Sequence, residues 1–369
     1  MNKKSTENNH KTIVINGRFL MQPTTGVQRY AYEVISAMEK IEKKQFKFIV
    51  AIPARNGMRN SYDFETSYDD SSLPPLIWQQ VRLPILMKKL RADLLWSPCN
   101  IGPIFSKAHV ISMHDAATFA GPEWFSPSFR TYYKTIFPLL GRIALKTLTV
   151  SHFSKDELIK HGITDAKKIR VLPEGVNLDK FTPNKTNNQN FSYVLTVSSR
   201  DPRKNIKRLI QAWKHLPPHI KQERKLIIAG RQINSFSIEE VNDISDDIHF
   251  TGYVTDERLI SLYSEADLFV YPSLYEGFGL PPLEAMACGC PVVASNVTSI
   301  PEVCGDAAFY VDPYSVESIS KGLSTLLTDR DLRQDLIKKG FERAKLFTWE
   351  KSAQEHIRVF EDVLRSRST

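Results

Sequence analysis

The sequence has few cysteines and no long apolar segment, and both absences narrow the classes of protein that it can encode. Its 369 residues include four cysteines, too few for the disulfide framework of a secreted scaffold. No stretch reaches the ~18 uninterrupted apolar residues that suggest a transmembrane helix. The first eleven residues, MNKKSTENNHK, are polar and lack the apolar core of a signal peptide. We therefore expect a cytoplasmic, soluble protein in a reducing compartment.

Several motifs that would assign other functions are also missing. The sequence has no zinc-finger spacing, no aromatic RNA-binding motif, no Walker A loop and no G-x-S-x-G segment. Cys288 and Cys290 flank a glycine without a second cysteine pair, so no zinc site is expected. Asp329, Arg330 and Asp331 form a D-x-D sequence, but its position after Thr328 indicates a helix cap rather than a metal site. Nucleic acid is therefore not an expected partner.

The net charge of +8 is unevenly distributed along the chain. Residues 1–186 carry a formal charge of +11, and residues 187–369 carry −3. Basic and apolar residues are mixed at 85–91 and 130–146. A basic half of this kind suits an anionic membrane surface or a lipid-phosphate acceptor. Solubilising surface lysines and ordinary amphipathic helices would explain the same pattern.

Apolar strands alternate with amphipathic helices along both halves of the chain, a pattern that predicts doubly wound parallel sheets. In the first half, strands are expected near 11–17, 46–53, 92–98, 109–115, 146–151 and 168–176, and helices near 26–40, 76–90 and 130–145. A further helix is expected to open at Ser154, because Glu157 three residues later completes a capping box. Asp69 and Asp70 are expected in a loop. The second half places strands near 191–199, 225–230, 247–254, 266–273 and 290–295, and helices near 205–216, 255–265, 281–288, 315–327 and 348–366.

A polar, asparagine-rich segment at 182–190 separates the halves and is interpreted as a linker. The prediction is an α/β protein with two Rossmann-like domains. Residues 1–186 form the N-terminal domain and residues 187–347 the C-terminal domain, and a helix at 348–369 packs back toward the N-terminal domain. Ligands of such folds bind outside the carboxyl ends of the strands.

The segment EGFGLPPLEAMACGCPVVAS at 276–295 concentrates the functional signal. Pro281 and Pro282 are tolerated at a helix start, where backbone N–H groups have no intrahelical partner. The glycines before them permit a tight turn and close approach of a ligand, and the helix N-terminus favours an anion. Glu276 precedes the turn and Glu284 lies in the first helical turns. Glu284 is placed to accept hydrogen bonds from sugar hydroxyls, and Glu276 could hold a hydroxyl of a transferring group or stabilise positive charge at carbon.

This segment resembles the E-x7-E signature of retaining glycosyltransferases of family 4, which have the GT-B fold of two Rossmann-like domains facing across a cleft. Further segments resemble the family in the same order, namely HDAATFAGPEWFS (114–126), VSHFSKDEL (150–158), VLPEGVNLDKF (171–181), DPRKN (201–205) and TGYV (251–254). The resemblance covers nearly the whole chain. It implies a metal-independent transferase without a cofactor, whose substrate is a nucleotide-diphosphate sugar.

The resemblance also implies roles for individual residues. Lys204 would contact the diphosphate, Glu276 would position the donor sugar, and His114 would touch the sugar or its reacting face. The remaining predicted donor-binding residues are Glu284, Arg200, Arg203, Gly26, Thr25, Tyr253, Val254, Gly277, Phe278, Gly279 and Leu280. Arg200 stands one residue later than the arginine of the family pattern. Backbone groups of 252–254 would recognise the base.

Similarity to O-antigen and capsule enzymes, carried by TGVQRYAYE and HD…PEWFS, implies a hexose donor, with mannose from GDP-mannose as the leading prediction. The acceptor would be a growing glycan, linked to a lipid at the inner face of the plasma membrane. Two other functions stay open at this point: a nucleotide-sugar epimerase of related fold, and a two-domain protein that binds a ligand without catalysis.

Overall fold

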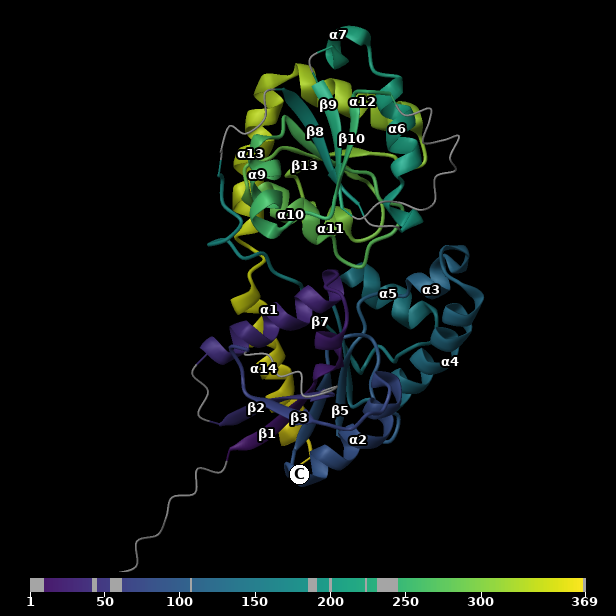
Figure 1. Ribbon diagram of the computed structural model, residues 1–369, viewed down its shortest axis with the longest axis vertical. Coiled ribbons are helices and arrows are strands. Elements are labelled where there is room, and N and C mark those ends of the chain that lie inside the picture. The colour runs from purple at the N-terminus through teal and green to yellow at the C-terminus, as the bar shows by residue number, and fades with distance from the viewer. Residues whose placement is uncertain are drawn as a thin grey trace, which may run out of the picture. The chain divides into compact units, whose positions relative to one another are not determined.

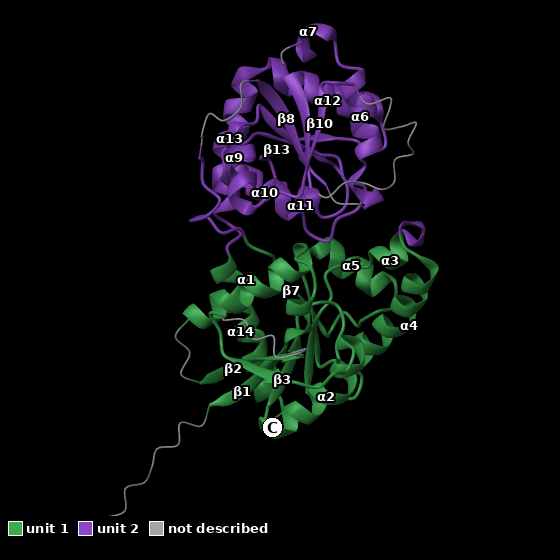
Figure 2. Cartoon of the chain, in the orientation of Figure 1, with its two compact units in different colours: residues 1–120, 125–175, 349–369 green, residues 121–124, 176–348 purple. Residues whose placement is uncertain are grey.

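The computed structural model of the protein describes residues 10–41, 45–53, 62–106, 108–184, 191–198, 201–222, 224–230 and 245–367. The chain divides into two compact units, coloured separately in Figure 2. Unit 1 comprises residues 1–120, 125–175 and 349–369, and unit 2 comprises residues 121–124 and 176–348. The sequence placed the first boundary after residue 186, whereas the units divide after Gly175. Residues 185–190 of the predicted linker lie outside the described part.

Unit 1, which includes the strands labelled β1, β2, β3, β5 and β7 in Figure 1, is built on a seven-stranded sheet. The strand order is β3-β2-β1-β4-β5-β6-β7, with every neighbouring pair parallel. Its strands are β1 (Lys11–Asn16), β2 (Phe46–Pro53), β3 (Thr66–Asp69), β4 (Leu94–Ser97), β5 (His109–Ser112), β6 (Lys146–Thr149) and β7 (Ile169–Val171). Its helices are η1 (Gly17–Met21), α1 (Gly26–Lys40), α2 (Pro75–Lys89), α3 (Ala117–Ala120), α4 (Pro127–Ile143), α5 (His152–Lys160) and α14 (Trp349–Arg365).

The last helix, α14, belongs to unit 1 although the chain reaches it through unit 2. His356 of α14 lies 2.7 Å from the Tyr30 hydroxyl of α1, and both side chains are buried. Phe360, also on α14, packs its ring 5.7 Å from that of Trp96 on β4. These contacts cover apolar residues of the sheet that would otherwise face water, so α14 completes the core of unit 1.

Unit 2 is built on a six-stranded parallel sheet in the order β10-β9-β8-β11-β12-β13. Its strands are β8 (Ser192–Val197), β9 (Arg224–Ala229), β10 (Ile248–Gly252), β11 (Leu268–Tyr271), β12 (Val292–Ser295) and β13 (Ala308–Val311). Its helices are η2 (Pro122–Trp124), η3 (Pro202–Lys204), α6 (Ile206–Lys214), α7 (Pro218–Lys221), α9 (Asp256–Glu265), α10 (Leu280–Ala287), α11 (Ile300–Cys304), α12 (Val316–Thr328) and α13 (Arg330–Ala344).

Two local predictions in unit 1 are wrong. The helix expected at Ser154 begins two residues earlier as α5, because the hydroxyl of Ser151 accepts from the Ser154 backbone N–H at 3.0 Å and caps it. Asp69 ends the short edge strand β3 rather than lying in a loop, and the Nε of Arg82 on α2 donates to it at 2.9 Å. The prediction for 329–331 is confirmed, because Asp329 caps α13 by accepting from the Leu332 N–H at 2.9 Å.

The order of strands reverses once in each sheet, between β1 and β4 in unit 1 and between β8 and β11 in unit 2. Such a switch point leaves a crevice beyond the carboxyl ends of the two strands, because the segments that follow them diverge. The two sheets therefore mark the segments after β1, β4, β8 and β11 as the places to look for ligand-binding residues.

Candidate functional site

The switch point of unit 2 brings together two segments that the sequence marks as functional. Strands β8 and β11 pair in parallel, with Val194 opposite Leu268, so their carboxyl ends meet at one edge of the sheet. The η3 turn follows β8, and the loop that carries Glu276 follows β11.

The side chain of Asn205 and one backbone hydrogen bond fix η3 against the loops that follow β11 and β13. Asn205 adopts a left-handed backbone conformation with φ of 59°, which turns the chain from η3 into α6. Its side-chain amide donates to the carbonyl oxygens of Pro272 at 3.0 Å and Pro313 at 2.7 Å. The N–H of Leu274 donates to the carbonyl oxygen of Arg203 at 2.8 Å. The position of η3 is therefore set by the backbone around the site.

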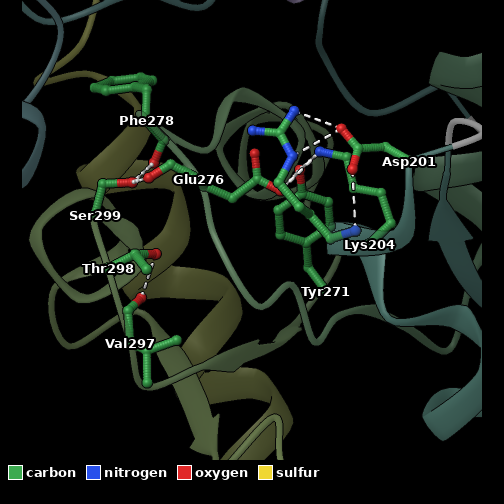
Figure 3. A network of polar contacts seen from close by, with 9 residues as sticks. Asp201, Lys204, Tyr271, Glu276, Phe278, Val297, Thr298 and Ser299 are labelled. Carbon is green, nitrogen blue, oxygen red and sulfur yellow. Dashed lines mark hydrogen bonds and ion pairs between the residues drawn. The ribbon is translucent and has the colours of Figure 1, made fainter. Parts of the chain in front are cut away.

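Lys204, Tyr271 and Glu276 form a closed triangle of hydrogen bonds, shown in Figure 3. The Lys204 ammonium lies 2.7 Å from both the Tyr271 hydroxyl and Glu276 Oε1. The Tyr271 hydroxyl donates to the same Oε1 at 2.8 Å. The ammonium also lies 5.0 Å from the centre of the Tyr271 ring, within cation–π range. The structure thus brings together two of the three predicted catalytic residues.

One of the two predicted arginines, Arg203, precedes Lys204 in η3. Arg203 is turned toward Asp201, with its Nε 2.8 Å from Oδ2. Burial raises the pKa of Asp201, but the hydrogen bond and the charge of Arg203 outweigh burial and hold the pKa below its usual value. The guanidinium therefore has a carboxylate partner, and its role in donor binding stays a prediction. Arg200 lies outside the described residues.

The turn from Glu276 into α10 requires a glycine at 279. Gly279 has φ of +114°, and a Cβ there would lie 2.6 Å from the Ile300 side chain. The Ser299 hydroxyl lies 2.9 Å from the carbonyl oxygen of Glu276 and 2.7 Å from that of Phe278, and holds the turn closed. The side chain of Phe278 is buried and packs against Phe347 with ring centres 5.7 Å apart. Leu280 is buried too, so any contact from these two positions to a ligand would come from backbone groups.

Glu284, the second glutamate of the motif, is 5% exposed on α10. Its Oε2 accepts from the Tyr263 hydroxyl on α9 at 3.3 Å. Burial beside this carboxylate raises the pKa of Tyr263, so the phenol keeps its proton and acts as the donor. Tyr263 orients the carboxylate, and binding of ribose hydroxyls by Glu284 stays a prediction.

His114 follows β5 in unit 1 and is held on both sides of its ring. Its Nε2 lies 2.9 Å from the carbonyl oxygen of Pro98, which can only accept, so Nε2 carries a proton. Its Nδ1 lies 3.5 Å from Oε1 of Glu174. Both side chains are buried, and the His114 ring meets the Tyr30 ring edge-on at 4.5 Å. In this conformation the ring has no free nitrogen for a sugar hydroxyl, and contact with the sugar stays a prediction.

Thr25 and Gly26 begin α1, in the segment after β1. Gln28 returns its side-chain oxygen to the Thr25 N–H at 3.2 Å, which makes a capping box. Gly26 is exposed, and a Cβ there would meet no atom within 4 Å. Packing within unit 1 therefore does not require the glycine, an observation that fits its predicted approach to a ligand.

Gly252, Tyr253 and Val254 form the predicted base-recognition segment at the end of β10. Gly252 has φ of +70°, and its carbonyl oxygen accepts from the Gly230 N–H at 2.9 Å. The side chain of Tyr253 is 71% exposed. Their contact with a base stays a prediction.

The sequence interpretation missed four residues that shape these sites. Tyr271, Asn205 and Ser299 organise the Lys204–Glu276 region, and Glu174 faces His114. Tyr271 could have been found, because it is the last residue of a buried strand at a switch point. Glu174 lies in the family-like segment 171–181 and Ser299 carries no local signal, but only the fold brings either residue to its partner.

Comparison with known proteins decides the family. Residues 24–180 match the family described as Glycosyltransferase Family 4, and residues 179–343 match Glycosyl transferases group 1. The O-antigen chain mannosyltransferase B of Escherichia coli is 34% identical over 92% of this chain and 96% of its own length. The chain belongs to glycosyltransferase family 4. The O-antigen chain mannosyltransferase RfbU of Salmonella typhimurium is 26% identical to this glycosyltransferase over 85% of the chain and 90% of its own length.

Solved structures agree on the fold of the glycosyltransferase. Sucrose-phosphate synthase from Thermosynechococcus elongatus has a TM-score of 0.77 at 19% identity and covers 97% of this chain and 100% of its own. WaaG, a glycosyltransferase involved in lipopolysaccharide biosynthesis, has a TM-score of 0.70 at 18% identity, covering 94% of this chain and 99% of its own. The predicted fold, GT-B with two doubly wound parallel-sheet domains, is confirmed.

Proposed function

We propose that this glycosyltransferase moves mannose from GDP-mannose to a growing, lipid-linked surface glycan, with retention of configuration and without a metal ion. The names of two relatives that match most of the chain support the sugar and the product class, because each is an O-antigen chain mannosyltransferase. The Lys204–Tyr271–Glu276 triangle at the switch point of unit 2 is the observation that carries the proposal.

Lys204 supplies the cation that the leaving group needs. Cleavage of the anomeric bond places negative charge on the distal phosphate of the nucleotide, and a fixed ammonium next to it stabilises that charge. Lys204 ends η3, and its side chain is 19% exposed, which supports access by a phosphate. The D-x-D sequence at 329–331, which was weighed as a metal site in the sequence analysis, has a structural role, since Asp329 caps α13.

Glu276 holds the donor sugar. Its carboxylate is 13% exposed beside the ammonium, close enough for one substrate to contact both groups. In a reaction on one face of the sugar, the departing phosphate oxygen accepts the proton of the acceptor hydroxyl. This step needs no histidine base, which agrees with the structure, because both ring nitrogens of His114 already have polar partners.

For the lipid-linked acceptor, we propose that unit 1 contacts the cytoplasmic face of an anionic membrane. No helix among the described residues is long and apolar enough to span a bilayer. Helix α2 nevertheless exposes Ile77, Val81 and Ile85 to solvent by 48–49% each, at four-residue spacing, and ends at Lys88 and Lys89. An apolar stripe beside lysines is the composition of a helix that lies in the membrane interface.

A thermal-shift screen tests the donor. A ligand present at about 100 times its dissociation constant stabilises the protein by about 3 kcal/mol, so the cognate diphosphate raises the melting temperature. We expect GDP to give the largest shift among GDP, UDP, dTDP and ADP. If another nucleotide gave the largest shift, the donor would carry that nucleotide instead of GDP. If none of the four raised the melting temperature, the proposal of a nucleotide-sugar donor would be refuted. Glu276→Ala separates a transferase from a binding protein, because it should abolish mannosyl transfer while nucleotide binding persists.

A further inference from the structure

The Tyr271 hydroxyl forms two hydrogen bonds within the candidate site, and the proposed function gives it no role. Tyr271 is the last residue of β11 and 1% exposed. An ammonium can only donate, so the Tyr271 oxygen accepts from Lys204, and the phenolic proton points to Glu276 Oε1. The direction of both hydrogen bonds is therefore fixed by the chemistry of the three groups.

The phenol keeps its proton at every pH at which the enzyme would work. Burial raises the pKa of Tyr271, and the negative charge of Glu276 raises it further. Tyr271 is therefore a permanent donor to the carboxylate rather than a group that exchanges protons with it.

Both hydrogen bonds to Glu276 end on the same oxygen. Lys204 and Tyr271 donate to Oε1, and no group in the described part of the chain donates to Oε2. Two donors on one oxygen restrict rotation of the carboxylate about its terminal bond. Oε2 is thereby held in one orientation with its acceptor capacity unused.

We propose that Tyr271 is a positioning residue, which anchors Glu276 by Oε1 and thereby presents Oε2 to a hydroxyl of the donor sugar. This proposal rests on the proposed function and adds Tyr271 as the residue that positions Glu276. When a diphosphate draws Lys204 toward itself, one of the two donors to Oε1 weakens. Tyr271 then keeps the carboxylate in place during the step in which the sugar leaves the phosphate.

The proposal separates binding of the nucleotide from binding of the sugar. Tyr271→Phe removes the hydroxyl and keeps the ring that fills the core. Nucleotide binding should change little, because Lys204 is still present. Recognition of the sugar should fall, because the carboxylate loses its fixed orientation.

The test measures dissociation constants of GDP and GDP-mannose by calorimetry, with UDP and UDP-glucose as a second pair. We expect the ratio of the GDP-mannose constant to the GDP constant to rise about tenfold in Tyr271→Phe, the size of a lost hydrogen bond to a charged group. Glu276→Ala should raise the same ratio at least as much. Tyr193→Phe is the matched control, because Tyr193 is equally buried in the same sheet and its hydroxyl donates to the Leu262 carbonyl oxygen at 2.8 Å.

The outcomes distinguish this proposal from the proposed function. A raised ratio in Glu276→Ala but not in Tyr271→Phe would overturn the role of Tyr271 and leave the donor site standing. An equal rise in Tyr193→Phe would also overturn it, since the effect would then be structural. If the wild-type protein bound neither nucleotide pair, the proposed function would fail, and this proposal with it.

Discussion

At the scale of single residues, the candidate site is defined by two opposite charges that lie against each other. The Lys204 ammonium and the Glu276 carboxylate are 2.7 Å apart and mostly buried. Under the proposed function, a diphosphate competes with Glu276 for the ammonium, and a hydroxyl of the donor sugar binds the carboxylate. The pair thus orders the site at the cost of some affinity, because part of the charge of Lys204 is already neutralised.

Replacing Lys204 should weaken the binding of diphosphates far more than that of monophosphates. If the ammonium contacts the distal phosphate, Lys204→Ala removes a charge-assisted hydrogen bond and lowers GDP affinity by about 10- to 100-fold. GMP lacks that phosphate, so its affinity should stay nearly unchanged. Calorimetric titration of both nucleotides measures the difference. Lys321→Ala, at an exposed position on α12, is the control. An equal loss of affinity for GDP and GMP would show that Lys204 contacts a part of the nucleotide that both share.

At the scale of elements, the turn between β11 and α10 shows why a short motif needs its glycine. The backbone at Gly279 has a conformation that other residues rarely adopt, and Ile300 of α11 fills the space where a side chain would go. The turn sets the direction of α10 and the position of Glu276 together. Its sequence is therefore restricted by backbone geometry.

Gly279→Ala should destabilise the protein by about 1–3 kcal/mol, through strain at positive φ and a clash with Ile300. Gly26→Ala provides a contrast, because a Cβ at that position meets nothing and alanine favours the helix start. Thermal melting should show a lower transition for Gly279→Ala alone. Weaker GDP binding by a stable Gly26→Ala would support its predicted contact with the diphosphate. Unchanged melting of Gly279→Ala would show that neither backbone strain nor Ile300 restricts this position.

The exposed stripe on α2 makes a second prediction at this scale. Wild-type protein should sediment with vesicles that contain anionic lipid and less with neutral vesicles, because apolar insertion and charge act together. Replacing Ile77, Val81 and Ile85 by serine should reduce sedimentation severalfold. Leu346→Ser is the control, because Leu346 is an exposed apolar residue of unit 2. Sedimentation that the triple variant retains would remove α2 as the membrane-binding element.

Periodicity in the sequence predicted most elements of both sheets, because a strand buried on both faces is almost wholly apolar, as in Val292–Ser295. It missed β3, whose residues TSYD have no apolar pattern and whose pairing depends on β2. It also missed the short strand β13, although its residues AFYV are apolar. Lys204 and Glu276 were predicted as site residues because they follow strands in recognisable motifs. Tyr271 was not, because a tyrosine that ends an apolar strand looks like core until the fold places an ammonium beside its hydroxyl.

At the scale of the whole molecule, the two units differ in how they should respond to acid. Unit 1 contains two fully buried histidines outside the candidate site, His109 and His356. Burial lowers the pKa of His109 to about 3 and that of His356 to about 4, and the proximity of His114 contributes to the second shift. The three histidines of unit 2, His215, His219 and His249, are all exposed. Only unit 1 therefore carries buried imidazoles that acid would protonate on unfolding.

The hydrogen bonds of His356 explain why it resists protonation. Its Nδ1 lies 2.7 Å from the Ser352 carbonyl oxygen, so this nitrogen carries the proton. Its Nε2 then accepts from the Tyr30 hydroxyl at 2.7 Å, a bond that joins α14 to α1. A second proton would occupy Nε2 and remove the acceptor. The folded state therefore favours neutral His356, whereas the unfolded chain takes up a proton near its ordinary pKa of about 6.5.

Unit 1 should consequently lose stability as the pH falls from about 6.5 toward about 4, because the unfolded state binds more protons across that range. The pKa of His356 differs between about 6.5 in the unfolded chain and about 4 in the folded protein. At about 1.4 kcal/mol for each pKa unit, His356 alone would lower the free energy of unfolding by about 3 kcal/mol. Urea unfolding at about pH 7.5 and about pH 5, with hydrogen exchange to assign each transition, should show unit 1 opening first in acid. His356→Gln keeps a neutral hydrogen-bonding side chain, so its stability should be lower at neutral pH but less dependent on pH. If unit 2 opened first, or if the variant kept the full pH dependence, buried histidines would not be the cause of acid sensitivity.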